Sequence, residues 1–133
     1  GRYSFQKHYF PRPGELDDDL FQEETACAID IDSLPQVSRW VRNLERQPER
    51  SFWLPTSSDR FYPDFVAELE DGRFLVVEYK GGVYFTNEDS REKLDIGSVW
   101  AQASAGRCVF VMVTHASIAG VSVATQLRRA IGG

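Results

Sequence analysis

Two carboxylates and a lysine stand close together in the most apolar part of the sequence. Asp64 precedes one apolar run, and Glu78 and Lys80 close the next, with Tyr79 between them. Carboxylate oxygens are the protein ligands that Mg²⁺ usually takes, together with waters and phosphate oxygens. A lysine beside such an ion can orient or deprotonate an attacking water, or neutralise charge developing on a phosphate. These residue types therefore indicate metal-assisted phosphate chemistry.

The two apolar runs must pair as a hairpin for these side chains to meet. Residues 70–73, with the sequence EDGR, separate them, and Asp-Gly between apolar runs is typical of hairpins. A two-residue loop would pair Asp64 with Tyr79 and mix polar with apolar faces. A three-residue loop, with Gly72 in the left-handed region, keeps the faces separate and places Asp64 opposite Glu78. The expected separation of the two Cβ atoms is then about 5 Å.

Two like charges side by side destabilise a fold unless something compensates for them. A divalent cation shared by Asp64 and Glu78 is the simplest compensation, with Lys80 one pleat further along the same face. The alternative is a surface hairpin that carries an ordinary Glu–Lys ion pair. Pro63 before Asp64, and the apolar run before Glu78, favour the metal site.

The same residues resemble the signature of a known family. Pro63-Asp64, followed by Glu78-Tyr79-Lys80 at the end of an apolar strand, is similar to the motif of PD-(D/E)xK nucleases. The longer resemblance is to the endonuclease domain at the C-terminal end of type III restriction-subunit-like helicases. The stretches that carry it are WVRNLER at 40–46, SFWLPTS at 51–57, FYPDFVAELEDGR at 61–73, VVEYKGG at 76–82 and the segment 93–100. The ordered set is more specific than the short motif alone.

This resemblance implies a Mg²⁺-dependent DNA endonuclease, with Mn²⁺ as a possible replacement ion. The implied catalytic residues are Asp64, Glu78 and Lys80. The implied metal ligands are the two carboxylates and the backbone carbonyl of Tyr79. The resemblance also implies a helicase motor ahead of Gly1 in a longer natural chain, and a methyltransferase or specificity subunit as a partner that selects the DNA sequence.

A further acid is expected on the first helix. Residues 20–31 have helical periodicity, and Glu24 falls on the same face as Cys27 and Ile31, where a carboxylate is unusual. In the PD-(D/E)xK superfamily an acid on the first helix often adds to the metal site. The resemblance therefore makes Glu24 a candidate ligand, with Glu23 as the alternative. The other interpretation is that both are solvent-facing helix charges.

Basic residues on one side of residues 36–45 suggest a contact with DNA. The apolar residues of this segment lie on the other side, in a short helix or an extended segment. Such a row of arginines is usually a solvated face, but in a nuclease it can also follow the phosphate backbone. The residues expected to contact nucleic acid are Arg39, Arg42, Asn43, Arg46 and Lys93.

The remaining pattern predicts an α/β fold. The expected strands are 51–54, 61–69, 74–80 and 108–114, and the expected helices are 20–31, 90–104 and 122–131. The first three strands would form an antiparallel meander. The fourth is apolar almost throughout, which favours burial on both faces and parallel pairing. The result is a mixed sheet flanked by helices, in the αβββαβ order of a restriction-endonuclease-like core.

The length of 133 residues is that of one domain with a real hydrophobic core. The family resemblance implies that residues 1–133 are a single endonuclease domain taken from a longer helicase–nuclease. No apolar run approaches the roughly 20 residues that cross a membrane, so no membrane partner is expected. Cys27 and Cys108 lie in apolar surroundings, which predicts buried free thiols and a cytoplasmic protein.

The overall charge argues against strong DNA binding by this chain alone. Its formal net charge is −5, although no acidic residue follows residue 100. Nucleic-acid affinity depends largely on basic residues that contact phosphates, so part of it would come from another domain or partner. The alternative function is a catalytically silent module that has kept the nuclease fold and docks to DNA or protein.

Overall fold

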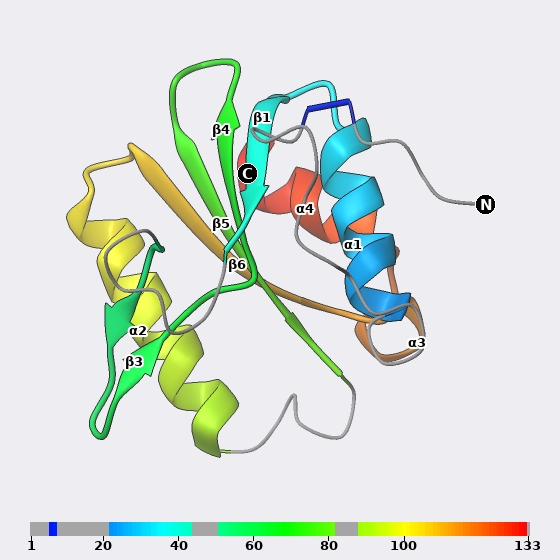
Figure 1. Cartoon of the computed structure of the whole chain (residues 1–133). Helices are drawn as coiled ribbons and strands as arrows, with labels where there is room; N and C mark the ends of the chain where they lie inside the picture. Colours follow the sequence, from blue (N-terminus) through cyan, green and yellow to red (C-terminus); the bar gives the residue numbers. More distant parts are fainter. Residues whose placement is uncertain (1–5, 8–21, 44–50, 82–87, 133) are drawn as a thin grey trace.

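The computed structural model describes residues 6–7, 22–43, 51–81 and 88–132 (Figure 1). In chain order its elements are α1 (Gln22–Ser33), β1 (Val37–Arg42), β2 (Leu54–Pro55), β3 (Arg60–Phe61), β4 (Phe65–Leu69), β5 (Phe74–Lys80), α2 (Glu88–Ala103), β6 (Cys108–Thr114), α3 (Ala116–Ala119) and α4 (Val123–Gly132).

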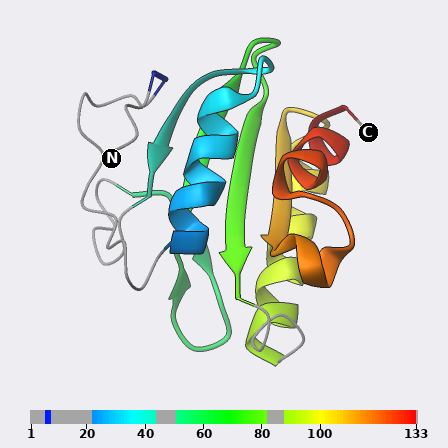
Figure 2. The same ribbon diagram turned by 90° about the vertical axis from the view of Figure 1, so that its right-hand side faces the viewer.

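A four-stranded mixed sheet in the order β1-β4-β5-β6 forms the centre of the fold. The β1–β4 and β4–β5 pairs are antiparallel, and β5–β6 is parallel. Helices α1 and α4 cover one face and α2 lies on the other, as the two views together show (Figures 1 and 2). The predicted mixed sheet flanked by helices is confirmed. The elements of the three layers follow the order α1-β1-β4-β5-α2-β6-α4 along the chain, and β2–β3 forms a separate ribbon.

The main core lies between the sheet and the α1–α4 layer. From α1 it contains Cys27, Ala28 and Ile31, and from α4 it contains Leu127 and Ile131. These positions fall on one side of each helix, which confirms the helical periodicity of both predicted segments. Among the residues that the structure describes, no helix has the length and apolarity needed to cross a membrane.

The first strand of the sheet is β1, which the sequence left open between a helix and an extended segment. The carboxylate of Asp32, buried at the end of α1, accepts a hydrogen bond from Trp40 Nε1 at 2.9 Å. It also accepts the backbone N–H groups of Gln6 and Lys7. The backbone N–H of Trp40 donates to the Lys7 carbonyl at 3.0 Å. Side-chain and backbone bonds distant in sequence thus hold β1 extended.

The prediction that 51–54 joins the sheet is wrong. Only Leu54 and Pro55 are in a strand there, and they pair with Arg60 and Phe61 in a ribbon outside the main sheet. Proline has no backbone N–H, so it cannot continue a central strand. The loop of this ribbon is attached to α2 instead, because the N–H of Ser57 donates to the Glu92 carboxylate at 2.8 Å.

The hairpin register follows the three-residue loop expected from the sequence. Phe65 pairs with Val77 and Ala67 with Leu75, so the same register places residue 64 opposite residue 78. Gly72 has φ = 89°, in the left-handed region that glycine adopts without strain. The alternating apolar residues of both strands are buried against α1 and α4. The pattern of apolar residues therefore determines which polar side chains share the opposite face.

Two predictions about the C-terminal half need partial correction. The pairing of β6 with β5 is parallel, as expected. Most β6 side chains are only half-buried, however, because β6 is an edge strand of the sheet. Both cysteines are free thiols; Cys27 is buried, whereas Cys108, at the start of β6, is half-buried.

Helix α2 packs unusually close to the sheet at Gly97. A Cβ atom built on this glycine would lie 2.4 Å from a ring carbon of Phe110 on β6. Such a contact is far inside van der Waals distance, so any larger residue would push the helix outward. Lys93 lies one helical turn before Gly97, so this close contact also determines how near Lys93 comes to the sheet.

Candidate active site

A pocket of about 340 Å³ contains the charged residues singled out from the hairpin. Its lining residues are Asp59, Arg60, Phe61, Tyr62, Asp64, Glu78, Tyr79, Lys80 and Lys93. Five of the predicted site residues, two acids, two lysines and Tyr79, therefore come together. Sequence reasoning missed the wall made by residues 59–62, because its place depends on contacts between residues far apart in sequence. Examples are the Ser57–Glu92 hydrogen bond and the packing of Phe61 against Phe110.

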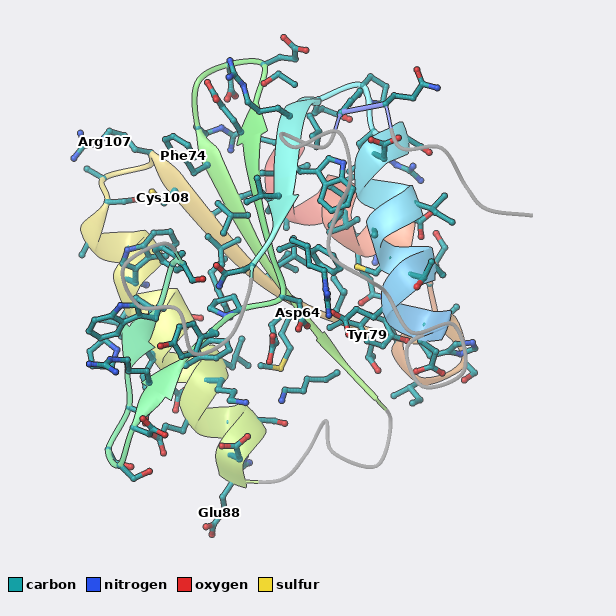
Figure 3. All side chains as sticks on the ribbon, viewed as in Figure 1. Asp64, Phe74, Tyr79, Glu88, Arg107 and Cys108 are labelled. Atoms are coloured by element: carbon teal, nitrogen blue, oxygen red, sulfur yellow. The ribbon has the colours of Figure 1, made fainter. Side chains whose placement is uncertain are left out.

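Asp64 lies at the entry to β4, beside the end of β5. Its Oδ2 accepts the backbone N–H of Tyr79 at 2.7 Å, and the two residues are seen between α1 and α2 in Figure 3. β4 begins only at Phe65, so the Asp64 carboxylate, rather than a backbone carbonyl of a longer strand, accepts the Tyr79 N–H. A strand end and a hydrogen bond thus fix the position of the first acid.

Glu78 is the more deeply buried of the two acids. It is 5% exposed, and its Oε1 is buried without a hydrogen-bond partner among the described residues. Unpaired buried oxygens of this kind are rare in native proteins and often mark a place for an ion or water. A divalent cation at this oxygen would explain its position.

Burial changes the acidity of both carboxyls. Burial, and then the neighbouring charge of Glu78, raise the pKa of Asp64 well above its ordinary value. Burial also raises the pKa of Glu78, against the lowering effects of its contact with Asp64 and of the lysine charges. The metal-free pair therefore keeps a proton to a higher pH than isolated carboxyls do.

Two lysines lie on the other side of Glu78. Lys80 Nζ is 3.3 Å and Lys93 Nζ is 3.9 Å from Glu78 Oε2. Lys93 also lies over the ring of Phe61, 5.2 Å from its centroid, a cation–π arrangement. Burial would lower the pKa of Lys93, but the neighbouring carboxylates of Asp89 and Glu78 raise it overall. The charged form of Lys93 is thus stabilised inside the pocket.

The end of β5 is held by residues that the sequence analysis did not single out. Lys80 pairs with Thr114 in the parallel register, and Thr114 Oγ1 donates to the Lys80 carbonyl at 2.8 Å. The side-chain amide of Gln126 on α4 binds both the N–H and the carbonyl of Thr114, at 3.1 and 2.8 Å. A buried threonine that closes an apolar strand was the available signal. These contacts fix the backbone that carries Lys80.

The first helix places its two acids differently. Glu23 accepts a hydrogen bond from the Tyr79 hydroxyl at 3.1 Å, and burial together with this contact raises the pKa of Tyr79. Glu24 Oε1 lies 3.9 Å from Arg42 Nε. The described residues contain no cluster of three or more His, Cys, Asp or Glu side chains that could hold a metal. A metal-ligating role for Glu24 stays a prediction.

The residues expected to contact DNA also have different surroundings. Arg39 is exposed on β1 and pairs with Glu68 at 3.1 Å. Arg42 is largely buried beside Glu24. Arg46 lies outside the described residues. Asn43 uses its whole side-chain amide on the protein backbone, donating to the carbonyls of Phe52 and Pro63 and accepting the Phe52 N–H, at 2.7–2.9 Å. These contacts give Asn43 a structural role that the sequence did not indicate.

Asn43→Ala should therefore destabilise the protein by about 1–3 kcal/mol, because it leaves several partly buried backbone groups without partners. Urea unfolding followed by circular dichroism would measure this loss. Arg39→Ala, which removes an exposed ion pair on β1, the strand that ends just before Asn43, should change the free energy of unfolding by less than about 1 kcal/mol. Equal effects of the two substitutions would contradict the structural role of Asn43.

The donor set fits a hard divalent cation. Two carboxylates face one polar pocket, and one of them has an unpaired buried oxygen. Mg²⁺ is commonly held by one or two carboxylates plus waters and substrate phosphate oxygens, so a third acid is not required. The fit is to an oxygen-ligated ion, since the described residues that line the pocket include neither cysteine nor histidine.

Comparisons with protein-family models, curated proteins and solved structures found no match for this chain. The geometry and chemistry of the site itself therefore indicate its function.

Proposed function

We propose that this chain is a nuclease domain that hydrolyses DNA phosphodiester bonds with Mg²⁺, or with Mn²⁺ in its place. The observation that carries the proposal is the pairing of Asp64 with the buried Glu78 in one pocket with Lys80. The αβββαβ order of the layers supports a restriction-endonuclease-like core. The motif resemblance supports the same reading.

The two carboxylates and the backbone carbonyl of Tyr79 would hold the cation. The bound cation would supply positive charge to the phosphate that is attacked. Lys80 orients the attacking water and stabilises the negative charge that develops on the phosphate oxygens. Attack of the water oxygen on phosphorus breaks the bond to O3′, which leaves a 5′-phosphate and a 3′-hydroxyl. These products are those that the family resemblance implies.

The wider setting is part of the same proposal. A helicase motor in the full-length chain would bring DNA to the pocket, and a methyltransferase or specificity subunit would select the sequence. A cytoplasmic location is consistent with the two free thiols. The net charge of −5 agrees with DNA affinity supplied partly from outside this chain.

Plasmid DNA incubated with the protein should be cut in Mg²⁺ or Mn²⁺ and remain intact in EDTA. Lys80→Ala should reduce the cleavage rate by about 10²–10⁴-fold, the usual contribution of a residue that assists proton transfer. Arg91→Ala removes a positive charge from an exposed position on α2 and serves as the matched control, with an unchanged rate.

Two outcomes would contradict this proposal. Cleavage that survives EDTA would exclude the metal-dependent reaction. Metal binding without any cleavage would favour the alternative function, a catalytically silent module for docking to DNA or protein.

A further inference from the structure

We propose that Lys80 and Lys93 form the subsite for a phosphate group, and that the carboxylate of Asp89 occupies this subsite until the phosphate displaces it. The identity of the ligand as a nucleic-acid phosphate rests on the proposed function. The role of Asp89 does not, because it follows from the distances between the three side chains.

Asp89 reaches both lysines from the solvent side of the pocket. Its Oδ2 lies 3.1 Å from Lys93 Nζ and 4.0 Å from Lys80 Nζ. The Asp89 side chain is 67% exposed, whereas those of Lys80 and Lys93 are 14% and 22% exposed. An exposed carboxylate therefore lies next to two largely buried ammonium groups, at the position where an anion entering from solvent would first meet them.

The two carboxylate partners of the lysine pair are held very differently. Glu78 is almost completely buried on β5 and makes the inner contacts, at 3.3 and 3.9 Å. Asp89 makes the outer contacts from the first turn of α2. Exposed ion pairs contribute little to stability, because water screens them and because they cost side-chain freedom. Asp89 is thus the replaceable partner of this pair.

The lysines do not need Asp89 to keep their places. Lys93 remains over the ring of Phe61 and within 3.9 Å of Glu78. The Lys80 backbone is held by Thr114. Displacement of Asp89 would therefore leave two fixed ammonium groups facing solvent. A phosphate offers several acceptor oxygens and negative charge to both ammonium groups. The Asp89 carboxylate serves them unequally, because it lies 4.0 Å from Lys80.

Asp89→Asn should raise the affinity for inorganic phosphate, and for a short single-stranded DNA, by about three- to tenfold. The measurement is titration calorimetry or NMR in EDTA, so that no divalent cation takes part. Glu88→Gln is the matched control, since Glu88 occupies the same exposed helix end and points away from the pocket (Figure 3). It should change the affinity by less than about twofold, because the screened charge lies further from the lysines.

Lys93→Gln should remove most of the gain in the Asp89→Asn background, and Lys93→Arg should keep it. Thermal melting of each variant confirms that it is folded. Equal effects of Asp89→Asn and Glu88→Gln would overturn the proposal, because they would show only a change in overall charge. An Asp89→Asn gain that does not depend on Lys93 would overturn it as well.

The proposed function can fail separately from this inference. If anion affinity depends on Asp89 and Lys93 but the wild-type protein does not cut DNA with Mg²⁺ or Mn²⁺, the phosphate subsite is supported and the nuclease function is contradicted. If DNA is cut but Asp89→Asn leaves the phosphate affinity unchanged, the nuclease function is supported and the displacement of Asp89 is contradicted.

Discussion

Asp64→Asn should abolish metal-dependent cleavage and leave the metal-free protein at least as stable as the wild type. The loss of rate should be at least about a hundredfold, since the substitution removes one of two charged ligands. The fold is spared because an asparagine oxygen can still accept the Tyr79 N–H, the contact that Asp64 makes at 2.7 Å. Removing the charge also ends its repulsion with Glu78.

The same substitution should change how stability depends on pH. In the wild type the pKa of Asp64 is raised in the folded state, first by burial and then by Glu78. Above about pH 4 the unfolded chain has lost this proton while the folded chain still holds it. The metal-free protein therefore loses stability as pH rises toward the raised pKa. Asp64→Asn should remove that part of the pH dependence, as melting temperatures in EDTA would show.

Metal adds an independent measurement. A cation that binds only the folded state stabilises it by an amount that grows with the logarithm of its concentration relative to the dissociation constant, and so raises the melting temperature. Mg²⁺ or Mn²⁺ should raise it for the wild type, and Asp64→Asn should lose most of this increment. Glu88→Gln, at an exposed position outside the pocket lining, should keep it.

Phe65→Ala, unlike Asp64→Asn, should destabilise the fold, with a loss of about 3–5 kcal/mol in the free energy of unfolding. Phe65 follows Asp64 directly, but its side chain faces the other side of the sheet and is fully buried. Its ring meets Trp40 edge-on, with centroids 5.7 Å apart. Truncation would leave a cavity between the sheet and α1, and the surrounding side chains would fill it only partly.

Urea unfolding with and without Mg²⁺ would measure this effect. The destabilisation should be the same with and without the ion, because Phe65 lies outside the pocket lining. Since a loss of this size approaches the total stability of a small domain, Phe65→Leu provides a milder substitution at the same position. If Asp64→Asn destabilises the protein as much as Phe65→Ala, and metal affects neither, the carboxylate pair is structural and the nuclease reading is wrong.

The hairpin could be predicted from sequence because its signals are local. Apolar alternation in β4 and β5 determines which faces turn inward, and Gly72 permits the loop that aligns them. Burial and register together then bring Asp64 and Glu78 into one pocket. Each step uses residues within one short segment, where side-chain periodicity is informative.

Other parts depend on contacts that periodicity does not encode. The extended form of β1 depends on Asp32, eight residues before its partner Trp40. The amide of Asn43 was interpreted as a DNA contact, because a polar residue beside arginines gives no sign that backbone groups surround it. No local pattern indicates that Asp89 lies near the lysines, since its distance to Lys80 depends on how α2 packs against the sheet.

The half of β5 that lies far from the pocket determines which face carries the chemistry. From Phe74 to Lys80, β5 runs about 20 Å from the hairpin loop to the pocket. A side chain's face depends on whether its position in the strand is odd or even. With the loop between Leu69 and Arg73 unchanged, deletion of Leu75 would shift every later residue of β5 by one position. Glu78 would then lie opposite Phe65 and face the core, away from Asp64. The site is thus sensitive to the number of residues in a part of the strand that it never touches.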